Sequence, residues 1–265
     1  MKKEIDLLDE LLKVYPGAVS QAFWRVFELR LFKKLDFIIP ILDLGCGDGS
    51  FSSLLFKDKK QKISSGCDLS ENKISKAKSL NLYENLRIAD ICKLPYENDV
   101  FNTVFSNCVL EHIPDEKSAL REVSRVLRKN GLFIFTVPSE MFPSYLYFYK
   151  NLIDKGLKEK AENYVKELNE QLQHHHYHSP DEWNLLLKEM GLTMIKAAYY
   201  MPEKSEYIWN KLYSIDFKKN KMNYIMRFFF SQFMNLVVKI YLRKYYLLET
   251  DSTKKGGGVF IIARK

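Results

Sequence analysis

Cysteine, proline and glycine are scarce in this chain, whose 265 residues include 4 cysteines, 8 prolines and 11 glycines. The cysteines, at positions 46, 67, 92 and 108, show no C-x-x-C spacing, which argues against the common zinc and redox motifs. No secretory segment opens the chain, so a disulfide-stapled secreted scaffold is not expected. We therefore expect a cytoplasmic protein whose cysteines are small packing residues.

The lysine of a phosphate-binding P-loop is also missing. Gly45, Gly47 and Gly49 follow the apolar run Ile41–Leu44, and the next lysine is Lys57. Their G-x-G-x-G spacing differs from the dinucleotide fingerprint G-x-G-x-x-G. A buried strand that stops in a glycine turn and then opens a helix presents free backbone N–H groups. Such a turn suits a carboxylate or a phosphate.

Further apolar runs predict the remaining strands of a sheet, over Lys62–Cys67, Leu86–Ala89, Phe101–Asn107, Gly131–Val137, Leu192–Tyr200 and Gly257–Ala263. Helical spacing predicts helices over Lys2–Val14, Ala18–Phe37, Ser118–Lys129, Tyr145–Leu157, Glu159–Leu172 and Glu182–Met190. Asp68 stands at the end of the second strand, and Asp90 directly follows the third. An acid at the exit of a second strand is placed to accept hydrogen bonds from ribose hydroxyls.

Five segments, ILDLGCGDGSF, GCDLS, ADICKLPY, NDVFNTVFSNCVLEHI and VLRKNGLFIFTVPS, resemble successive motifs of class I S-adenosyl-L-methionine-dependent methyltransferases. The resemblance covers residues 38–138. It implies an α/β fold with a Rossmann-like, mostly parallel seven-stranded sheet in the order 3-2-1-4-5-7-6 and helices on both faces. It also places helical insertions after strand 5 and between strands 6 and 7.

We accordingly expect one methyltransferase domain over residues 1–265. N-terminal helices occupy residues 1–37, and the cofactor-binding core occupies 38–138. A helical lid follows over 139–178, and a basic aromatic insertion covers 201–256.

By resemblance, the cofactor is S-adenosyl-L-methionine, and its site residues follow the strands. Asp43 is expected to hydrogen-bond the glycine turn and help hold the methionine moiety, which the backbone of the turn approaches closely. Asp68 is assigned to the ribose hydroxyls, Leu69 and Ile91 to the adenine ring, and Asp90 to the adenine amino group. The complete set expected to bind the cofactor is Asp43, Gly45, Cys46, Gly47, Asp68, Leu69, Asp90, Ile91 and Asn107.

The segment Ser106–His112 indicates the class of methyl acceptor. Nucleic-acid amino-methyltransferases carry a Pro-Pro-aromatic motif here, whereas this chain has Cys108-Val109, so nucleic acid is not the expected partner. Leu110–Pro114 resembles the small-molecule branch that includes quinone methyltransferases. We expect O-methylation of a small or lipid-linked acceptor, such as a saccharide or a lipid-linked intermediate. The alternatives are an RNA or protein methyltransferase and a catalytically silent cofactor-binding partner protein.

Four of the five histidines lie within His174–His178, so this short segment has three interpretations. A metal site is not predicted, because no cysteine or carboxylate pair of matching spacing lies nearby in the sequence. A structural role fits the capping box that follows at Ser179–Glu182. A general base is the third interpretation, and the candidate bases are His112, His176 and His178.

The positive charge is concentrated in the last quarter of the chain. Residues 201–265 carry 13 basic and 5 acidic side chains, against a net charge of +8 for the whole chain. The aromatic, basic segment Met222–Leu248 has only eleven residues between Arg227 and Lys239, fewer than the ~20 that a membrane-spanning helix needs. It is typical of an interfacial helix at an anionic membrane surface, which would make the protein peripheral at the inner face. Packing on the protein's own core or in a homodimer is the alternative.

Overall fold

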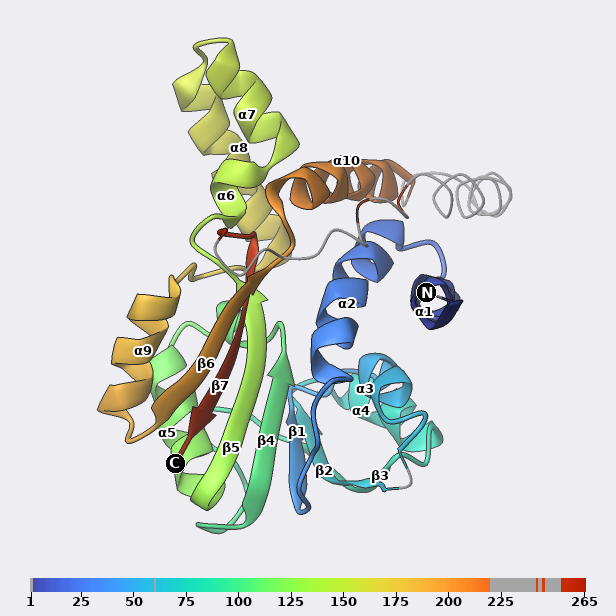
Figure 1. The fold of residues 1–265 in the computed structure, drawn as a ribbon, viewed down its shortest axis with the longest axis vertical. Coiled ribbons are helices and arrows are strands. Elements are labelled where there is room, and N and C mark those ends of the chain that lie inside the picture. The colour runs from blue at the N-terminus through green and yellow to red at the C-terminus, as the bar shows by residue number, and fades with distance from the viewer. Residues whose placement is uncertain (1, 60, 220–241, 243–244, 246–253) are drawn as a thin grey trace.

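The computed structural model describes residues 2–59, 61–219, 242, 245 and 254–265, and its centre is a seven-stranded sheet (Figure 1). The order β3-β2-β1-β4-β5-β7-β6 confirms the predicted order. Neighbours from β3 to β5 are parallel, whereas β7 is antiparallel to both β5 and β6. The strands are β1 (Ile41–Leu44), β2 (Ile63–Asp68), β3 (Tyr83–Ile88), β4 (Phe101–Asn107), β5 (Leu127–Pro138), β6 (Thr193–Tyr200) and β7 (Gly258–Arg264).

Helices cover both faces of this sheet, and a further group stands beyond its carboxyl edge. In Figure 1, α5 and α9 lie on one side and α2 to α4 on the other, while α7 and α8 project away from the sheet beside α10. The helices are α1 (Lys2–Val14), α2 (Val19–Phe32), α3 (Ser50–Leu55), α4 (Glu71–Ser79), α5 (Glu116–Val126), α6 (Phe142–Tyr145), α7 (Tyr147–Asp154), α8 (Lys158–Leu172), α9 (Pro180–Glu189) and α10 (Glu203–Lys219). A short 3-10 helix, η1, spans Leu110–His112.

Two hydrophobic cores form because successive side chains of a strand point to opposite faces. In β4, Phe105 joins the core under α2 and α10, whereas Val104 joins the core under α5 and α9. Phe260 and Ile261 of β7 divide in the same way. The continuous apolar runs of the sequence therefore reflect strands that are buried on both faces.

Several predicted element boundaries differ from the structure. The helix expected over Ala18–Phe37 is α2, which ends at Phe32. The helix expected over Ser118–Lys129 is α5, which ends at Val126, because Leu127 already pairs with Phe101 in the sheet. Asn130, with φ of 66°, lies within β5, so the end of the predicted helix belongs to the strand.

The first lid helix, expected over Tyr145–Leu157, is α7, which spans Tyr147–Asp154, and the short helix α6 precedes it. Leu146 is buried and extended between α6 and α7. The break lets Leu146 pack into the core under α2 and α10.

The predicted interfacial helix Met222–Leu248 lies outside the described residues except for Leu242 and Tyr245. Leu242 is 1% exposed and belongs to the core under α2 and α10. The carbonyl of Tyr245 accepts a hydrogen bond from Ser205 Oγ at the start of α10. Among the helices that the structure describes, none has the length and apolarity to cross a bilayer.

The buried carboxyl group of Glu206 in α10 provides a test of this packing. Glu206 is fully buried, its carboxyl oxygens have no hydrogen-bond partner among the described residues, and burial raises its pKa well above the ordinary value. A raised pKa means that the folded state holds a proton that the unfolded state releases, so this residue's contribution to stability falls as pH rises. We expect the Glu206→Gln variant to gain stability relative to wild type between about pH 5 and pH 8, by up to about 1.4 kcal/mol per pH unit.

The free energy of unfolding, measured by urea denaturation across this pH range, checks the expectation. Glu167→Gln, at an exposed acid of α8, is the control and should track the wild type. A difference between Glu206→Gln and wild type that stays constant with pH would contradict the assignment.

Candidate active site

The glycine turn after β1 forms the floor of a cleft, and its backbone fits only a residue without a side chain. Gly45 has φ of 72°, and a Cβ there would lie 2.6 Å from the methyl groups of Val109. Gly49, with φ of 76°, is the residue before α3. The Asp48 carboxylate accepts a hydrogen bond from the backbone N–H of Ser50 at 3.0 Å, which closes the turn onto the helix. Because glycine adopts positive φ at no steric cost, the sequence can make this sharp strand-to-helix connection.

The cleft above this turn lies at the carboxyl ends of β1, β2 and β4 and has a volume of about 570 Å³. All nine residues predicted to bind the cofactor line it: Asp43, Gly45, Cys46, Gly47, Asp68, Leu69, Asp90, Ile91 and Asn107. Parallel strands bring their carboxyl ends to one edge of the sheet, where ligands of open α/β sheets bind. The fold thus gathers residues that are up to 64 positions apart in the sequence.

The acids of the cleft have partners that differ in part from those expected. Asp43 does not bond the turn: its carboxyl group accepts hydrogen bonds from Ser52 Oγ at 2.5 Å and from the Tyr83 hydroxyl at 2.7 Å. Burial raises the pKa of Asp43 to about 7. Asp68 takes the expected place instead, because its carboxylate accepts a hydrogen bond from the N–H of Gly47 at 3.0 Å. The prediction that an acid accepts a hydrogen bond from the turn is therefore correct, but the acid is Asp68 and not Asp43.

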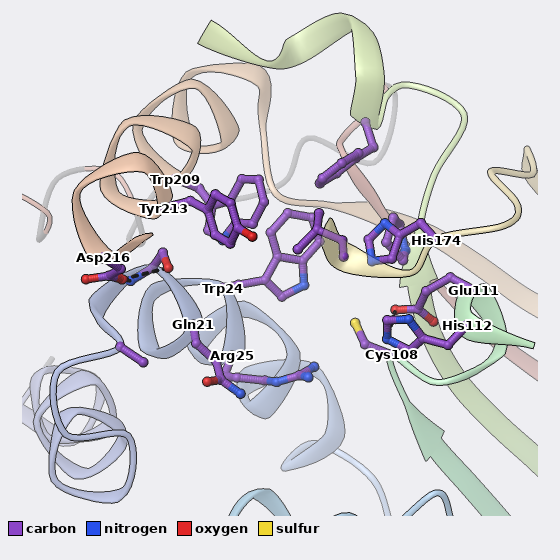
Figure 2. Close-up of a pocket in the computed structure, with 15 residues that line it drawn as sticks. Gln21, Trp24, Arg25, Cys108, Glu111, His112, His174, Trp209, Tyr213 and Asp216 are labelled. Atoms are coloured by element: carbon purple, nitrogen blue, oxygen red, sulfur yellow. Dashed lines mark hydrogen bonds and ion pairs between the residues drawn. The ribbon is translucent and has the colours of Figure 1, made fainter. Parts of the chain in front are cut away.

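A second cavity of about 340 Å³ adjoins the cleft (Figure 2). The two spaces share four lining residues, Gln21, Arg25, Cys108 and His112. Four aromatic side chains from α2, α6 and α10 also line the second cavity: Trp24, Phe142, Trp209 and Tyr213. A molecule in the second cavity would therefore lie beside a ligand in the cleft.

A buried carboxylate holds the wall between the cleft and the cavity. Glu28 of α2 is fully buried and accepts hydrogen bonds from Trp24 Nε1 at 2.7 Å and from the Tyr200 hydroxyl at 2.9 Å. It also pairs with Arg25 at 2.6 Å, and the thiol of Cys108 donates to it. Buried charges are stable only when they are paired and hydrogen-bonded, and this one meets both conditions.

His112 is the predicted base that faces both spaces. Its Nδ1 lies 3.0 Å from the carbonyl oxygen of Gln173. A carbonyl can only accept, so Nδ1 carries the proton and Nε2 keeps its lone pair. Burial lowers the pKa of His112 below its ordinary value, which favours the neutral ring.

His176 and His178 line neither of these two spaces, so the structure does not support their prediction as bases. His176 Nε2 lies 2.7 Å from the carbonyl oxygen of Ile113. His178 Nε2 lies 2.9 Å from a carboxylate oxygen of Glu116, and this hydrogen bond raises the pKa of His178. Both rings thus anchor the segment before α9, where the predicted capping box of Ser179 and Glu182 forms.

Sequence reasoning did not single out Glu111, Arg25 and Glu28, which the structure places in or beside the site. Glu28 and Arg25 are charged residues in the apolar stripe of α2. A charge at such a position could have indicated a functional role from the sequence alone. Glu111 lines the second cavity, is 2% exposed, and has a pKa that burial raises to about 8. His174 lines the same cavity, where burial lowers its pKa to about 3.

Comparison with known proteins identifies the relatives of this chain. The chain is 26% identical over 191 residues to the ubiquinone biosynthesis O-methyltransferase of Coxiella burnetii, which covers 67% of this chain and 74% of that protein. It is 28% identical over 211 residues to the ubiquinone/menaquinone biosynthesis C-methyltransferase of Rickettsia rickettsii, with 72% and 80% covered.

A solved structure shares the fold. Phosphoethanolamine N-methyltransferase 2 of Haemonchus contortus, in complex with S-adenosyl-L-methionine, superposes with a TM-score of 0.56 at 19% identity, covering 89% of this chain and 51% of that one. A family model described as a methyltransferase domain matches residues 38–228. The chain belongs to this family and is an S-adenosylmethionine-dependent methyltransferase.

Proposed function

We propose that this methyltransferase transfers the methyl group to a hydroxyl group on a ring-shaped acceptor held in the second cavity, and that the acceptor is free or carried on a lipid. The observation that carries the proposal is the shared wall, since Cys108 and His112 line both the cofactor cleft and the aromatic cavity. Methyl transfer requires the two reactants to be in contact and aligned, and adjoining spaces provide that arrangement.

The cleft residues fit S-adenosylmethionine. A Cβ on Gly47 would meet no atom within 4 Å, so this turn leaves room for the amino-acid end of a ligand. Leu69 is 73% exposed at the cleft, where it can cover the adenine ring, and the exposed carboxylate of Asp90 can accept from the adenine amino group. Asp68 is assigned to the ribose hydroxyls. When bound, the cofactor supplies an electrophilic methyl group on a sulfonium ion.

The second cavity suits a flat ring. A volume of about 340 Å³ is at the small end of the range for ligand pockets. Trp209 is at the centre of the aromatic lining, with its ring centroid 5.3 Å from that of Trp24 and 5.4 Å from those of Phe142 and Tyr213. Aromatic walls pack against the faces of sugars and of aromatic rings alike. Because apolar rings predominate here, a hydroxylated aromatic ring is favoured over a saccharide.

His112 positions the acceptor hydroxyl. Its Nε2 lone pair can accept the hydroxyl hydrogen bond at the boundary of the two spaces, which orients the oxygen toward the cofactor. Alignment of the two reactants can supply about 7–11 kcal/mol of the barrier, and removal of the hydroxyl proton a further 10²–10⁴-fold in rate. The relatives named as O- and C-methyltransferases agree with acceptors other than nitrogen.

A lipid-carried acceptor is supported by the position of α10. Trp209, Tyr213 and Asp216 of this helix line the cavity, and the chain continues from α10 into the basic aromatic segment Met222–Leu248. If that segment lies on an anionic membrane, the acceptor cavity would be close to the lipid surface. The residues of the lid, 139–178, contribute Phe142, Leu172 and His174 to the same cavity.

The direct test is a mass-shift screen with methyl-deuterated S-adenosylmethionine. We expect a deuterated product when the protein is incubated with small phenols, or with a lipid extract, under conditions where a saccharide panel gives none. Labelled RNA or protein in place of these products would instead support a polymer methyltransferase. Cofactor binding without any labelled product across all panels would support a catalytically silent partner protein.

The assignment of Asp68 predicts that Asp68→Ala binds S-adenosylmethionine at least 100-fold more weakly. The physical reason is the loss of a charged acceptor for two ribose hydroxyls, each hydrogen bond contributing about 1.5–3 kcal/mol. Isothermal titration calorimetry measures the affinity, and circular dichroism checks that the variant remains folded. Asp58→Ala is the control, because Asp58 is 78% exposed and lies outside both spaces. Unchanged affinity in Asp68→Ala would refute the assignment.

The assignment of the acceptor cavity predicts a selective effect of Tyr213→Ala. Tyr213 lines the cavity, so the variant removes one aromatic ring against which the acceptor can pack, a contact that contributes about 0.5–1.5 kcal/mol. We expect the KM for the acceptor to rise about 2–13-fold while the Kd for the cofactor stays constant. Tyr207→Ala is the matched control, since Tyr207 is on the same helix but packs against Tyr147. Equal effects of the two variants on KM would contradict the proposed cavity.

A further inference from the structure

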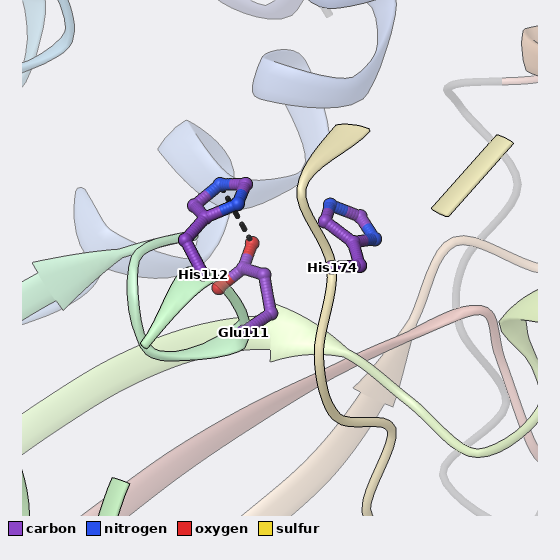
Figure 3. A group of neighbouring side chains, drawn as sticks. All are labelled: Glu111, His112 and His174. Carbon is purple, nitrogen blue, oxygen red and sulfur yellow. Dashed lines mark ion pairs between the residues drawn. The ribbon is translucent and has the colours of Figure 1, made fainter. Parts of the chain in front are cut away.

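Three side chains in the wall of the second cavity form a candidate metal site (Figure 3). Glu111 and His112 come from the turn η1, and His174 comes from the segment after α8. One possible ligand atom from each lies within 4.8 Å of the others. No metal site was predicted here, because Glu111 is 63 residues from His174 and only the fold brings this carboxylate beside the histidine.

The Glu111 carboxyl group is the strongest sign that a ligand belongs here. Glu111 is 2% exposed, and its Oε2 has no hydrogen-bond partner among the described residues. Its Oε1 lies 3.9 Å from His112 Nε2, too far for a hydrogen bond. A buried polar atom without a partner is costly, so such an atom calls for an explanation, and a bound ion is one.

Both imidazole rings are oriented as metal ligands usually are. His112 donates from Nδ1 to the carbonyl oxygen of Gln173. His174 Nδ1 lies 2.9 Å from the Tyr177 hydroxyl, which itself donates to Asn169 Oδ1, so the Tyr177 oxygen accepts the Nδ1 proton. Each ring therefore keeps the lone pair on Nε2. A hydrogen bond from the second ring nitrogen is the regular support of a metal-binding histidine.

A second cluster of the same composition lacks this feature. Glu116, His176 and His178 also lie within 4.8 Å of one another. Here His178 Nε2 already bonds the Glu116 carboxylate, and His176 Nε2 already bonds the Ile113 carbonyl. These ligand atoms are satisfied by the protein. The second cluster serves as an internal control for the first.

We propose that Glu111, His112 and His174 bind a divalent transition-metal ion, with the acceptor hydroxyl as a further ligand. Two imidazoles and one carboxylate are a ligand set of catalytic zinc sites, which keep a position open for water or substrate. All three residues line the acceptor cavity, so the open position would face the acceptor. A coordinated hydroxyl loses its proton to solvent more readily, just as water does on a metal. This role rests on the proposed function, and with the ion bound it replaces the direct hydrogen bond from His112 to the acceptor.

Cobalt titration tests the site without the need for an acceptor. We expect the metal-free protein, residues 1–265, to bind Co²⁺ at one high-affinity site and to show visible absorption bands typical of low-symmetry Co²⁺ coordination. The binding of S-adenosylmethionine is measured on the same sample. His174→Ala and Glu111→Gln should weaken Co²⁺ binding at least 100-fold while cofactor affinity persists. His178→Ala, in the second cluster, should bind Co²⁺ as the wild type does.

The outcomes separate the metal site from the proposed function. Wild-type protein that binds S-adenosylmethionine but not Co²⁺ would overturn the metal site alone. Co²⁺ binding lost in His178→Ala and kept in His174→Ala would also overturn it, because the ion would then belong to the second cluster. Failure to bind S-adenosylmethionine would count against the proposed function and leave the cobalt result to stand by itself.

Discussion

The carboxylate of Glu28 is the interaction on which the arrangement of the site depends. It is buried under α2 and joins three parts of the chain, since its partners include Arg25 of the same helix, Cys108 after β4 and Tyr200 at the end of β6. A charge removed from water is costly unless its partners replace the hydration. Satisfying Glu28 therefore requires α2 to lie over the carboxyl edge of the sheet. The wall between cofactor cleft and acceptor cavity is a consequence of that position.

The fold was predictable wherever the local residue pattern and the tertiary contacts favour the same secondary structure. Apolar runs such as Phe101–Asn107 are strands buried on both faces, and their pattern needs no long-range information. The end of α5 was not predictable locally, because Lys129-Asn130-Gly131 suits a helix cap and an irregular strand equally well. The pairing of Leu127 with Phe101 decides between them, and that contact depends on the assembled sheet.

The cofactor cleft was predictable for a topological reason, and the acceptor cavity was not. Residues that follow parallel strands meet at one edge, so strand order alone places acids such as Asp68 and Asp90 in the cleft, while their roles toward the cofactor were implied by the resemblance. The acceptor cavity is built by α2, α10 and the lid, whose contacts join distant segments. The backbone N–H of Ser20, for example, donates to Asp216 at 2.7 Å across 196 positions. No periodicity within either helix indicates such a contact, and the grouping of Glu111 with His174 has the same origin.

The position of β7 affects how the molecule can be made. This strand follows β5 and β6 in the sequence, yet it lies between them in the sheet. During synthesis, β6 therefore cannot dock in its final place until β7 has left the ribosome. Until then, the edge of β5 that pairs with β7 has no partner strand. The sheet can thus be completed only after β7 has been synthesised.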